Sequence, residues 1–323
     1  MMTALQKACG WHRPLMAIAA LMLLCTLLSL AGIALDPRQI LGAPAWVKPL
    51  KFSLSILLYT VTWAWLIAHL PRWRRLTHAL GTVIAVTLAI EQVLIIWAAA
   101  SGTTSHFNIS NGVNTGVWAT MAAAITIMYL CTLVTSAAVF FMRLPSVALT
   151  IAVRAGVLIA LAGIGVAFLM TAPTADQLSS PSGIAGAHAV GVSDGGPGLP
   201  LLGWSTEGGD YRVAHFIGMH ALQLLPILAV VLNAAARRLP ALSHPEVQLS
   251  LVIAAAAAYT AAVALLTAQA AVGQSVAQPD YLFFAAGSVI FLILGLSAAT
   301  IINQGLKIAA HKQEMKPESL SKR

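Results

Sequence analysis

Charged residues are scarce in this chain. Only 9% of its 323 residues are Asp, Glu, Lys or Arg, whereas a soluble domain carries roughly 25%. Apolar residues make up 59% of the sequence, and the mean hydropathy is +0.85. This composition excludes an ordinary soluble domain and is typical of an integral membrane protein that crosses the bilayer several times.

Cysteine is nearly absent as well. The three cysteines are Cys9, Cys25 and Cys131, the last two lie inside apolar runs, and no CxxC motif occurs. Neither a disulfide framework nor a zinc motif is therefore supported. We expect buried thiols that behave as small apolar side chains.

The sequence also lacks a nucleic-acid-binding pattern. The formal charge is +8, but the Lys and Arg residues fall in short patches between apolar runs. No basic helix is interleaved with aromatic residues, and no binding module is recognisable. We exclude nucleic acid as a partner and read the basic patches as markers of membrane topology instead.

Eight apolar stretches are long enough to cross a bilayer, which takes about 20 mainly apolar residues. They cover residues 15–35, 51–70, 79–100, 116–141, 147–172, 214–236, 248–271 and 281–304. We predict an all-α bundle of about eight transmembrane helices in a single domain over residues 1–306, with a basic cytoplasmic tail over 307–323. The first stretch could also be a signal peptide, but its apolar run of about 21 residues exceeds the roughly 7–15 of a cleaved one. We expect an uncleaved helix.

Basic residues predict the orientation of these helices. With the N-terminus inside, 13 Lys and Arg residues fall on the cytoplasmic side and four on the other side, which are Arg38, Lys48, Lys51 and Arg212. Lys and Arg concentrate in cytoplasmic loops. The pattern predicts a multi-pass protein of a bacterial-type inner membrane, with both termini cytoplasmic and the lipid bilayer as its first partner.

Two segments on the predicted outer side have unusual compositions. Residues 36–50 contain three prolines and Trp46, which suits an interfacial turn or half-helix with an aromatic anchor. Residues 173–213 form a loop with nine glycines and four prolines. Because this loop also contains Leu199, Leu201 and Trp204, it is too apolar for ordinary disorder. We predict an ordered Gly/Pro-rich cap over the outer ends of the helices.

Ionisable groups inside a bilayer are costly and are functional candidates by default. Glu91 lies eight residues before the outer end of the third stretch, at a depth of about 12 Å for a rise of 1.5 Å per residue. His220 lies about 10 Å deep in the sixth stretch by the same calculation. The matching depths predict a catalytic or protonation pair between spans three and six. On a helical projection of the sixth span, His215, His220 and Gln223 form one polar arc.

Further candidates lie near the predicted mouth of this site. His and carboxylate side chains are the usual ligands of transition metals, and we expect any metal ligands among His106, His188, Asp210, His215 and His220. His215 and Gln223 are candidate cofactor-binding residues. Substrate or mouth residues are expected at Asn108, Trp204, Glu207 and Arg212. Each histidine taken singly is also compatible with an ordinary polar contact.

Haem is possible only in a restricted form. A stacked haem pair between helices needs two histidines on each of two spans, and only the sixth stretch has two. A single haem held by His215 or His220 and a partner from another segment stays open. The cofactor is therefore unknown, with a transition metal or one haem as the two candidates.

Three functions fit these features. The first is a membrane enzyme with a metal- or haem-dependent redox site that faces outward between spans three and six. The second is a proton-coupled transporter in which Glu91 and His220 exchange the proton. The third is a non-enzymatic membrane subunit that binds a periplasmic protein or a small molecule through the outer loop.

Overall fold

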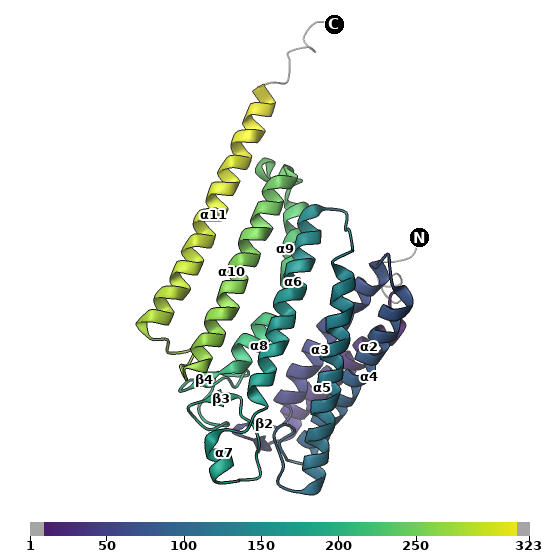
Figure 1. The fold of residues 1–323 in the computed structure, drawn as a ribbon, viewed down its shortest axis with the longest axis vertical. Coiled ribbons are helices and arrows are strands. Elements are labelled where there is room, and N and C mark those ends of the chain that lie inside the picture. The colour runs from purple at the N-terminus through teal and green to yellow at the C-terminus, as the bar shows by residue number, and fades with distance from the viewer. Residues whose placement is uncertain (1–9, 315–323) are drawn as a thin grey trace, which may run out of the picture. The chain divides into compact units, whose positions relative to one another are not determined.

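The computed structural model describes residues 10–314, with side chains up to residue 311. The predictions for Cys9, Lys7 and residues 315–323 of the basic tail lie outside the described residues. Within them, every long element is a helix (Figure 1).

The long helices follow one another along the chain with short connections, except before α8. They are α2 (Arg13–Leu35), α3 (Val47–His69), α4 (Arg74–Ala100), α5 (Gly112–Val139), α6 (Val147–Val166), α8 (Tyr211–Met219), α9 (Ala221–Ala235), α10 (Pro245–Ala271) and α11 (Tyr281–Glu314). The short elements are η1 (Ala167–Met170), α7 (Ala175–Ser179), η2 (Pro240–Ser243) and the two-residue strands β1 (Gln39–Ile40), β2 (Ala43–Pro44), β3 (Ala189–Val190) and β4 (Gly209–Asp210).

Seven of these helices are long and apolar enough to cross a membrane, and α8 with α9 adds an eighth if the two form one interrupted span. The predicted all-α, multi-pass architecture is confirmed. Several helices extend beyond the apolar stretch that predicted them, because hydrophobicity marks the bilayer-crossing part and not the helix end. Thus α4 begins at Arg74, and α11 continues to Glu314 through the first part of the predicted tail. The orientation of the termini stays a prediction.

The sixth predicted span is not one continuous helix. α8 ends at Met219, α9 begins at Ala221, and His220 between them has φ −85° and ψ −1°. These angles lie in the sparsely populated bridge region and not in the helical one. The helical projection that placed His215, His220 and Gln223 on one polar arc assumed an unbroken helix. Because the helix breaks at His220, the projection does not apply across the break.

By its internal contacts the chain divides into two compact units. The first unit comprises Met1–Met142, Leu161–Met219 and Leu266–Asp280, and the second comprises Arg143–Ala160, His220–Leu265 and Tyr281–Arg323. Each unit is described by itself below.

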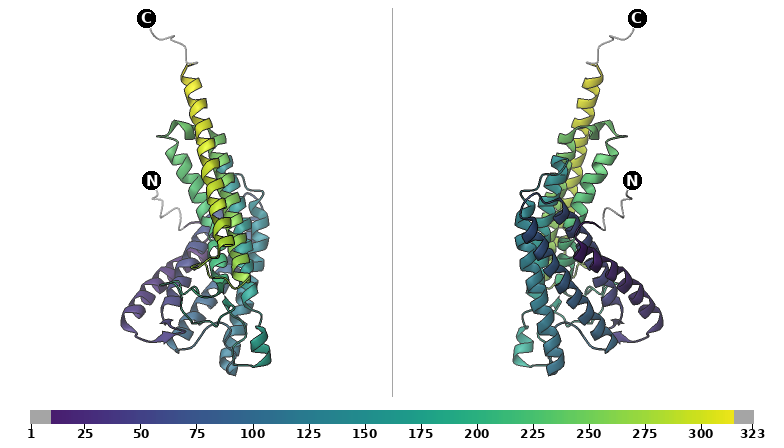
Figure 2. Two further views of the ribbon diagram at one scale, coloured as in Figure 1. Left: turned by 90° about the vertical axis from the view of Figure 1, so that its left-hand side faces the viewer. Right: turned by 90° about the vertical axis from the view of Figure 1, so that its right-hand side faces the viewer.

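In the first unit, α2 packs along α3, α3 along α4, and α4 along α5 (Figures 1 and 2). Trp63, Met22 and Met121 are buried in this packing. Hydroxyl groups between the helices bond within the bundle, as where Tyr59 and Thr132 approach to 2.5 Å. Leu23, Leu27 and other large apolar side chains of α2 stay exposed. Polar side chains inside and leucines outside are the arrangement that a lipid surrounding requires.

Close backbone contact fixes the turn between α2 and α3. A Cβ atom at Gly32 would lie 2.4 Å from the ring of Trp46, so only glycine allows the indole to lie there. The Trp46 indole in turn donates to Asp36 Oδ2 at 2.8 Å. Between them β1 and β2 form a tight antiparallel hairpin. For residues 36–50 the sequence predicted either a turn or a half-helix. The structure has a turn, and α3 begins at Val47.

The long loop between η1 and α8 is ordered through its own hydrogen bonds and those to neighbouring segments. β3 pairs with β4, Ile109 N donates to the Gly183 carbonyl at 2.8 Å, and Ala185 N donates to the Phe107 carbonyl at 2.8 Å. Ser275 Oγ donates to the Ser205 carbonyl at 2.8 Å. These bonds place the loop beside residues 101–111 and 272–280. Its role as an outer cap stays a prediction.

The second unit has a small core around η2. Leu242, Val247 and Leu251 are buried there and pack against Leu232 of α9 and Ile301 of α11. Glycine permits the close approach of α11 to η2, because a Cβ at Gly305 would lie 2.6 Å from the Ala241 carbonyl oxygen. Most of α11 stays exposed, with Phe284, Phe291 and Leu292 among its large apolar side chains, which is expected of a helix in contact with lipid.

Candidate site around His106 in the first unit

Glu91 is a buried carboxyl group without a hydrogen bond. Its side chain is 1% exposed, and neither carboxyl oxygen has a hydrogen-bond partner. Among the described residues, its ion-pair contact is with His106, whose Nε2 lies 3.5 Å from Glu91 Oε1. A buried polar group without a partner is rare in native proteins and needs an explanation. Inside a membrane helix, that explanation is function by default.

His106 reaches Glu91 from the short loop that follows α4. Its Nδ1 lies 3.1 Å from Lys48 Nζ and 3.0 Å from Ser105 Oγ. The ring is enclosed by aromatic side chains, with centroid distances of 5.8 Å to Phe52 and 5.6 Å to Trp118. Burial, followed by the positive charge of Lys48, holds the pKa of His106 well below its usual range. The ring is therefore neutral at neutral pH.

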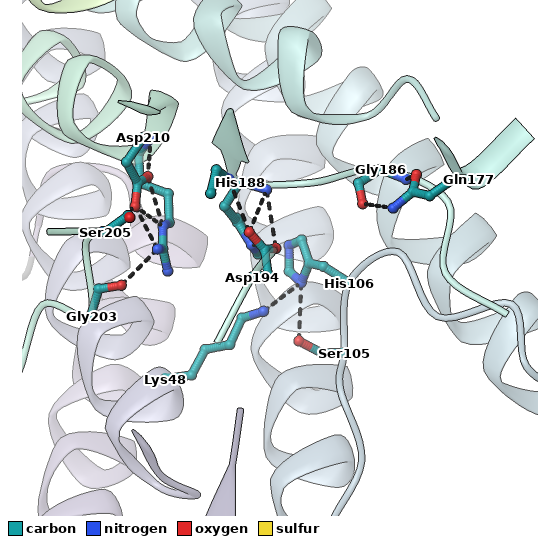
Figure 3. Close-up of polar contacts among 12 residues, drawn as sticks. Lys48, Ser105, His106, Gln177, Gly186, His188, Asp194, Gly203, Ser205 and Asp210 are labelled. Carbon is teal, nitrogen blue, oxygen red and sulfur yellow. Dashed lines mark hydrogen bonds and ion pairs between the residues drawn. The ribbon is translucent and has the colours of Figure 1, made fainter. Parts of the chain in front are cut away.

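Lys48 completes a chain of three groups, which we call the relay triad: Lys48, His106 and Glu91. Lys48 lies in the first turn of α3, and none of the ion pairs in the described part of the chain joins it to a carboxylate. The two ring nitrogens of His106 have different neighbours: Nδ1 faces Lys48, as Figure 3 shows, and Nε2 faces Glu91. An ammonium donor at Nδ1 assigns the ring proton to Nε2, on the side of Glu91.

His188 and Asp194 lie next to the triad. The His188 Nδ1 is 2.6 Å from Asp194 Oδ2, and the rings of His188 and His106 are 6.3 Å apart (Figure 3). The backbone N–H groups of His188 and Ala189 also donate to this carboxylate. Burial opposes ionisation of Asp194, but these hydrogen bonds outweigh it and hold the pKa well below its usual range. Asp194 is thus a fixed negative charge that orients His188.

Asp210 and Arg212 form a separate ion pair. The Arg212 Nη2 lies 2.6 Å from Asp210 Oδ2 and also donates to the Gly203 carbonyl at 2.6 Å. Asp210 is 1% exposed and accepts a further bond from Ser205 N. Its oxygens are used by partners that tie the long loop to the start of α8. This role accounts for Asp210, a predicted metal ligand, and for Arg212, a predicted mouth residue.

Three other predicted mouth residues have different surroundings. Asn108 is buried and bonds Thr103 and Ser110 within its own loop. The Trp204 ring packs edge-on against Phe216, with centroids 5.8 Å apart. Glu207 is exposed. Asn108 and Trp204 have structural contacts that account for them, and their role at a substrate mouth stays a prediction.

His215 is held from α6. Its Nδ1 lies 2.8 Å from the Gly163 carbonyl oxygen, and His215 is close enough to His106 that a positive charge on His215 helps to lower the pKa of His106. Glycine is needed for this arrangement, because a Cβ at Gly163 would lie 2.5 Å from the backbone of Gly218. The first unit therefore brings together Glu91, His106, His188 and His215 of the residues that the sequence singled out.

His220 and Gln223 belong to the second unit. The His220 Nδ1 lies 3.3 Å from Gln223 Oε1, so the two predicted residues contact each other. Glu91 belongs to the first unit, and its pairing with His220 stays a prediction. Among the described residues, no three His, Cys, Asp or Glu groups are arranged so that they could hold a metal ion. The five predicted metal ligands do not form a ready-made metal centre in that part of the chain.

Sequence reasoning did not single out Lys48 or Asp194 as site residues. Lys48 carried a signal, since it is one of only four basic residues on the predicted outer side and it directly precedes a proline in an apolar context. Asp194 carried almost none, because an Asp before two glycines is also typical of an ordinary turn.

Comparison of the chain with protein-family models, with curated protein sequences and with solved structures found no match.

Proposed function

We propose that this multi-pass membrane protein is a proton-coupled transporter whose proton-handling site is the relay triad. One observation carries the proposal: the carboxyl group of Glu91, buried in a candidate membrane helix and without a hydrogen bond, faces a partly buried imidazole that bonds Lys48 on its other side. His106, and not His220, is the partner of Glu91 in this proposal. The site faces the outer side in the predicted orientation.

The triad can pass a proton without leaving a charge on the ring. The transfer starts from the state with a protonated Glu91, a neutral Lys48 amine and the ring proton on Nδ1. Glu91 then gives its proton to Nε2 of His106 while the Nδ1 proton moves to the amine, which yields the tautomer assigned above with an ammonium donor at Nδ1. Glu91 ends as a carboxylate, Lys48 as an ammonium, and the ring as the opposite neutral tautomer. Because the pKa of His106 lies well below its usual range, such a concerted transfer is favoured over one through a charged imidazolium.

The gap between His106 and Glu91 supplies a control point. A separation of 3.5 Å exceeds a good hydrogen bond by several tenths of an ångström. Transfer therefore requires a small side-chain movement or a bridging water. A conformational change that alters this one distance would couple proton movement to substrate movement, which is what a coupled transporter requires.

A proton-flux assay tests the proposal. The purified protein is reconstituted in proteoliposomes with an internal pH-sensitive dye, an inside-negative potassium diffusion potential is imposed, and candidate small-molecule substrates are added outside, because a coupled transporter moves protons only together with its substrate. We expect proton uptake in the native protein and a loss of roughly tenfold or more in Glu91→Gln, as for removal of a proton-transfer group. The matched control is Glu246→Gln, which removes an exposed carboxylate of the second unit and should leave uptake unchanged. Equal uptake in the Glu91→Gln and native proteins would refute the role of the triad.

A metal-dependent membrane enzyme is the second candidate, and one observation favours it. The Nδ1 atoms of His188 and His215 are held by Asp194 and by the Gly163 carbonyl, which is how metal-binding histidines are oriented so that Nε2 faces the ion. Elemental analysis and absorption spectroscopy of the purified protein decide this case. Stoichiometric metal or haem lost in His188→Ala would support the enzyme, and protein that is free of both would remove the candidate.

A further inference from the structure

A second polar feature of the first unit lies at the turn between α3 and α4, at the opposite ends of these helices from Lys48 and His106. A cavity of about 410 Å³ is present there. Its lining includes Trp11, Ile67, Arg74, Arg75 and His78. The lining therefore combines aromatic and aliphatic side chains with basic ones. None of these residues belongs to the relay triad.

Within residues 10–314, the two arginines of the cavity have no acidic partner in an ion pair. Both are exposed. The turn and first helical residues from 70 to 79 read LPRWRRLTHA and contain no carboxylate. Two adjacent guanidinium groups without an acidic neighbour form an anion-binding surface, because Arg presents planar donors that match phosphate.

Two lining residues, His78 and Trp11, are held by contacts with neighbouring side chains. His12 is fully buried, its Nε2 lies 2.9 Å from the His78 carbonyl oxygen, and its ring lies 4.2 Å from the His78 ring. The Trp11 ring stands edge-on to His69 at 6.4 Å. A left-handed residue, Trp73 with φ 55°, turns the chain sharply so that Arg74 and Arg75 begin α4. The cavity is therefore a shaped part of the fold and not only a run of charge.

The position of the cavity selects the kind of anion. It lies where α3 and α4, both long and apolar enough to cross a membrane, end in a short turn, which is at the bilayer surface. Basic pockets at this level, with an aromatic side chain beside them, are suited to a lipid phosphate and its first methylene groups. We infer that the cavity of Trp11, Arg74, Arg75 and His78 binds the phosphate headgroup of an anionic phospholipid.

Lipid binding to the purified full-length protein tests the inference. Delipidated protein is titrated with phosphatidylglycerol, with phosphatidylcholine or with inorganic phosphate alone, and thermal unfolding and native mass spectrometry report binding. We expect phosphatidylglycerol to bind in preference to phosphatidylcholine, and Arg74→Gln/Arg75→Gln to weaken it by roughly tenfold or more. Arg74→Lys/Arg75→Lys keeps the charge and should keep most of the binding.

The control removes the same charge elsewhere. Arg237→Gln/Arg238→Gln lies in the second unit and is not part of the cavity lining. It should leave phosphatidylglycerol binding within about twofold of the native value, because specific binding depends on the guanidinium groups of the cavity and not on the total charge. An equal loss in both double variants would overturn the site and leave only general surface attraction. Unchanged binding in Arg74→Gln/Arg75→Gln, confirmed as folded by circular dichroism, would also overturn it. Inorganic phosphate that protects as well as phosphatidylglycerol would overturn the lipid assignment.

Discussion

At the scale of single residues, the balance between burial and hydrogen bonding separates structural from functional groups. Asp210 is as buried as Glu91, at 1% exposure each, but Asp210 has an arginine and a backbone donor whereas neither oxygen of Glu91 has a hydrogen bond. A buried carboxylate with partners holds a fold together. A buried carboxylate without hydrogen-bond partners lowers the stability of the fold. Such a group is expected only where it has a function.

The lowered pKa of His106 predicts that the protein is less stable in acid. The pKa of His106 in the folded protein lies well below the usual value. In the unfolded chain, His106 therefore binds a proton near pH 6.5, whereas in the folded protein it stays unprotonated at that pH. Stability should therefore fall as the pH drops below about 6.5, by up to about 1.4 kcal/mol per pH unit for this one group. His106→Gln should flatten the pH dependence of thermal unfolding over this window.

The control for this prediction is His69→Gln, which changes an exposed histidine at the end of α3. It should leave the slope of stability against pH as in the native protein. If His106→Gln and His69→Gln give the same slope as the native protein, His106 is not held neutral by the fold.

At the scale of elements, two glycines of α6 permit a matched comparison. A Cβ at Gly163 would lie 2.5 Å from the backbone of Gly218 in α8, whereas a Cβ at Gly165 would meet nothing closer than Tyr129 Oη at 3.6 Å. Both residues belong to the same helix. Only the first is required for the close approach that carries His215 to the Gly163 carbonyl.

We therefore expect Gly163→Ala to destabilise the protein by about 1–3 kcal/mol, as overpacking does. Gly165→Ala should be neutral or slightly stabilising, because alanine is the better helix former by about 1 kcal/mol. Thermal unfolding in detergent measures both. A Gly163→Ala variant as stable as Gly165→Ala would mean that α6 and α8 are not in close contact at this point.

At the scale of the whole molecule, the sequence was sufficient for the architecture. Apolar stretches predicted the long helices because lipid leaves a chain few alternatives to helix. The same reasoning missed the break at His220. Gly218 lies two residues before it and Pro226 six residues after it, but the residues directly on both sides are apolar, so the hydropathy pattern continues through the break. Periodicity describes an unbroken helix only.

The candidate site was predictable in part, for a related reason. Glu91 was visible because a carboxylate is conspicuous inside an apolar run. Its contact with His106 was not, because depth in a membrane can be counted along a helix whereas the position of a loop cannot. The loop from residue 101 to 111 brings His106 to α3 and α5 through contacts with Lys48, Phe52 and Trp118, and Lys48 and Phe52 are distant in sequence.

The relay triad is tested most directly by whether Glu91 and His106 act as one unit. Proton uptake into proteoliposomes is measured for Glu91→Gln, for His106→Gln and for the double variant. When two groups act in one step, removing either one abolishes the step, and removing the second adds no further loss. The double variant should therefore lose no more proton uptake than the more damaging single variant. Losses that multiply in the double variant, or single variants that transport like the native protein, would contradict a proton path through Glu91 and His106.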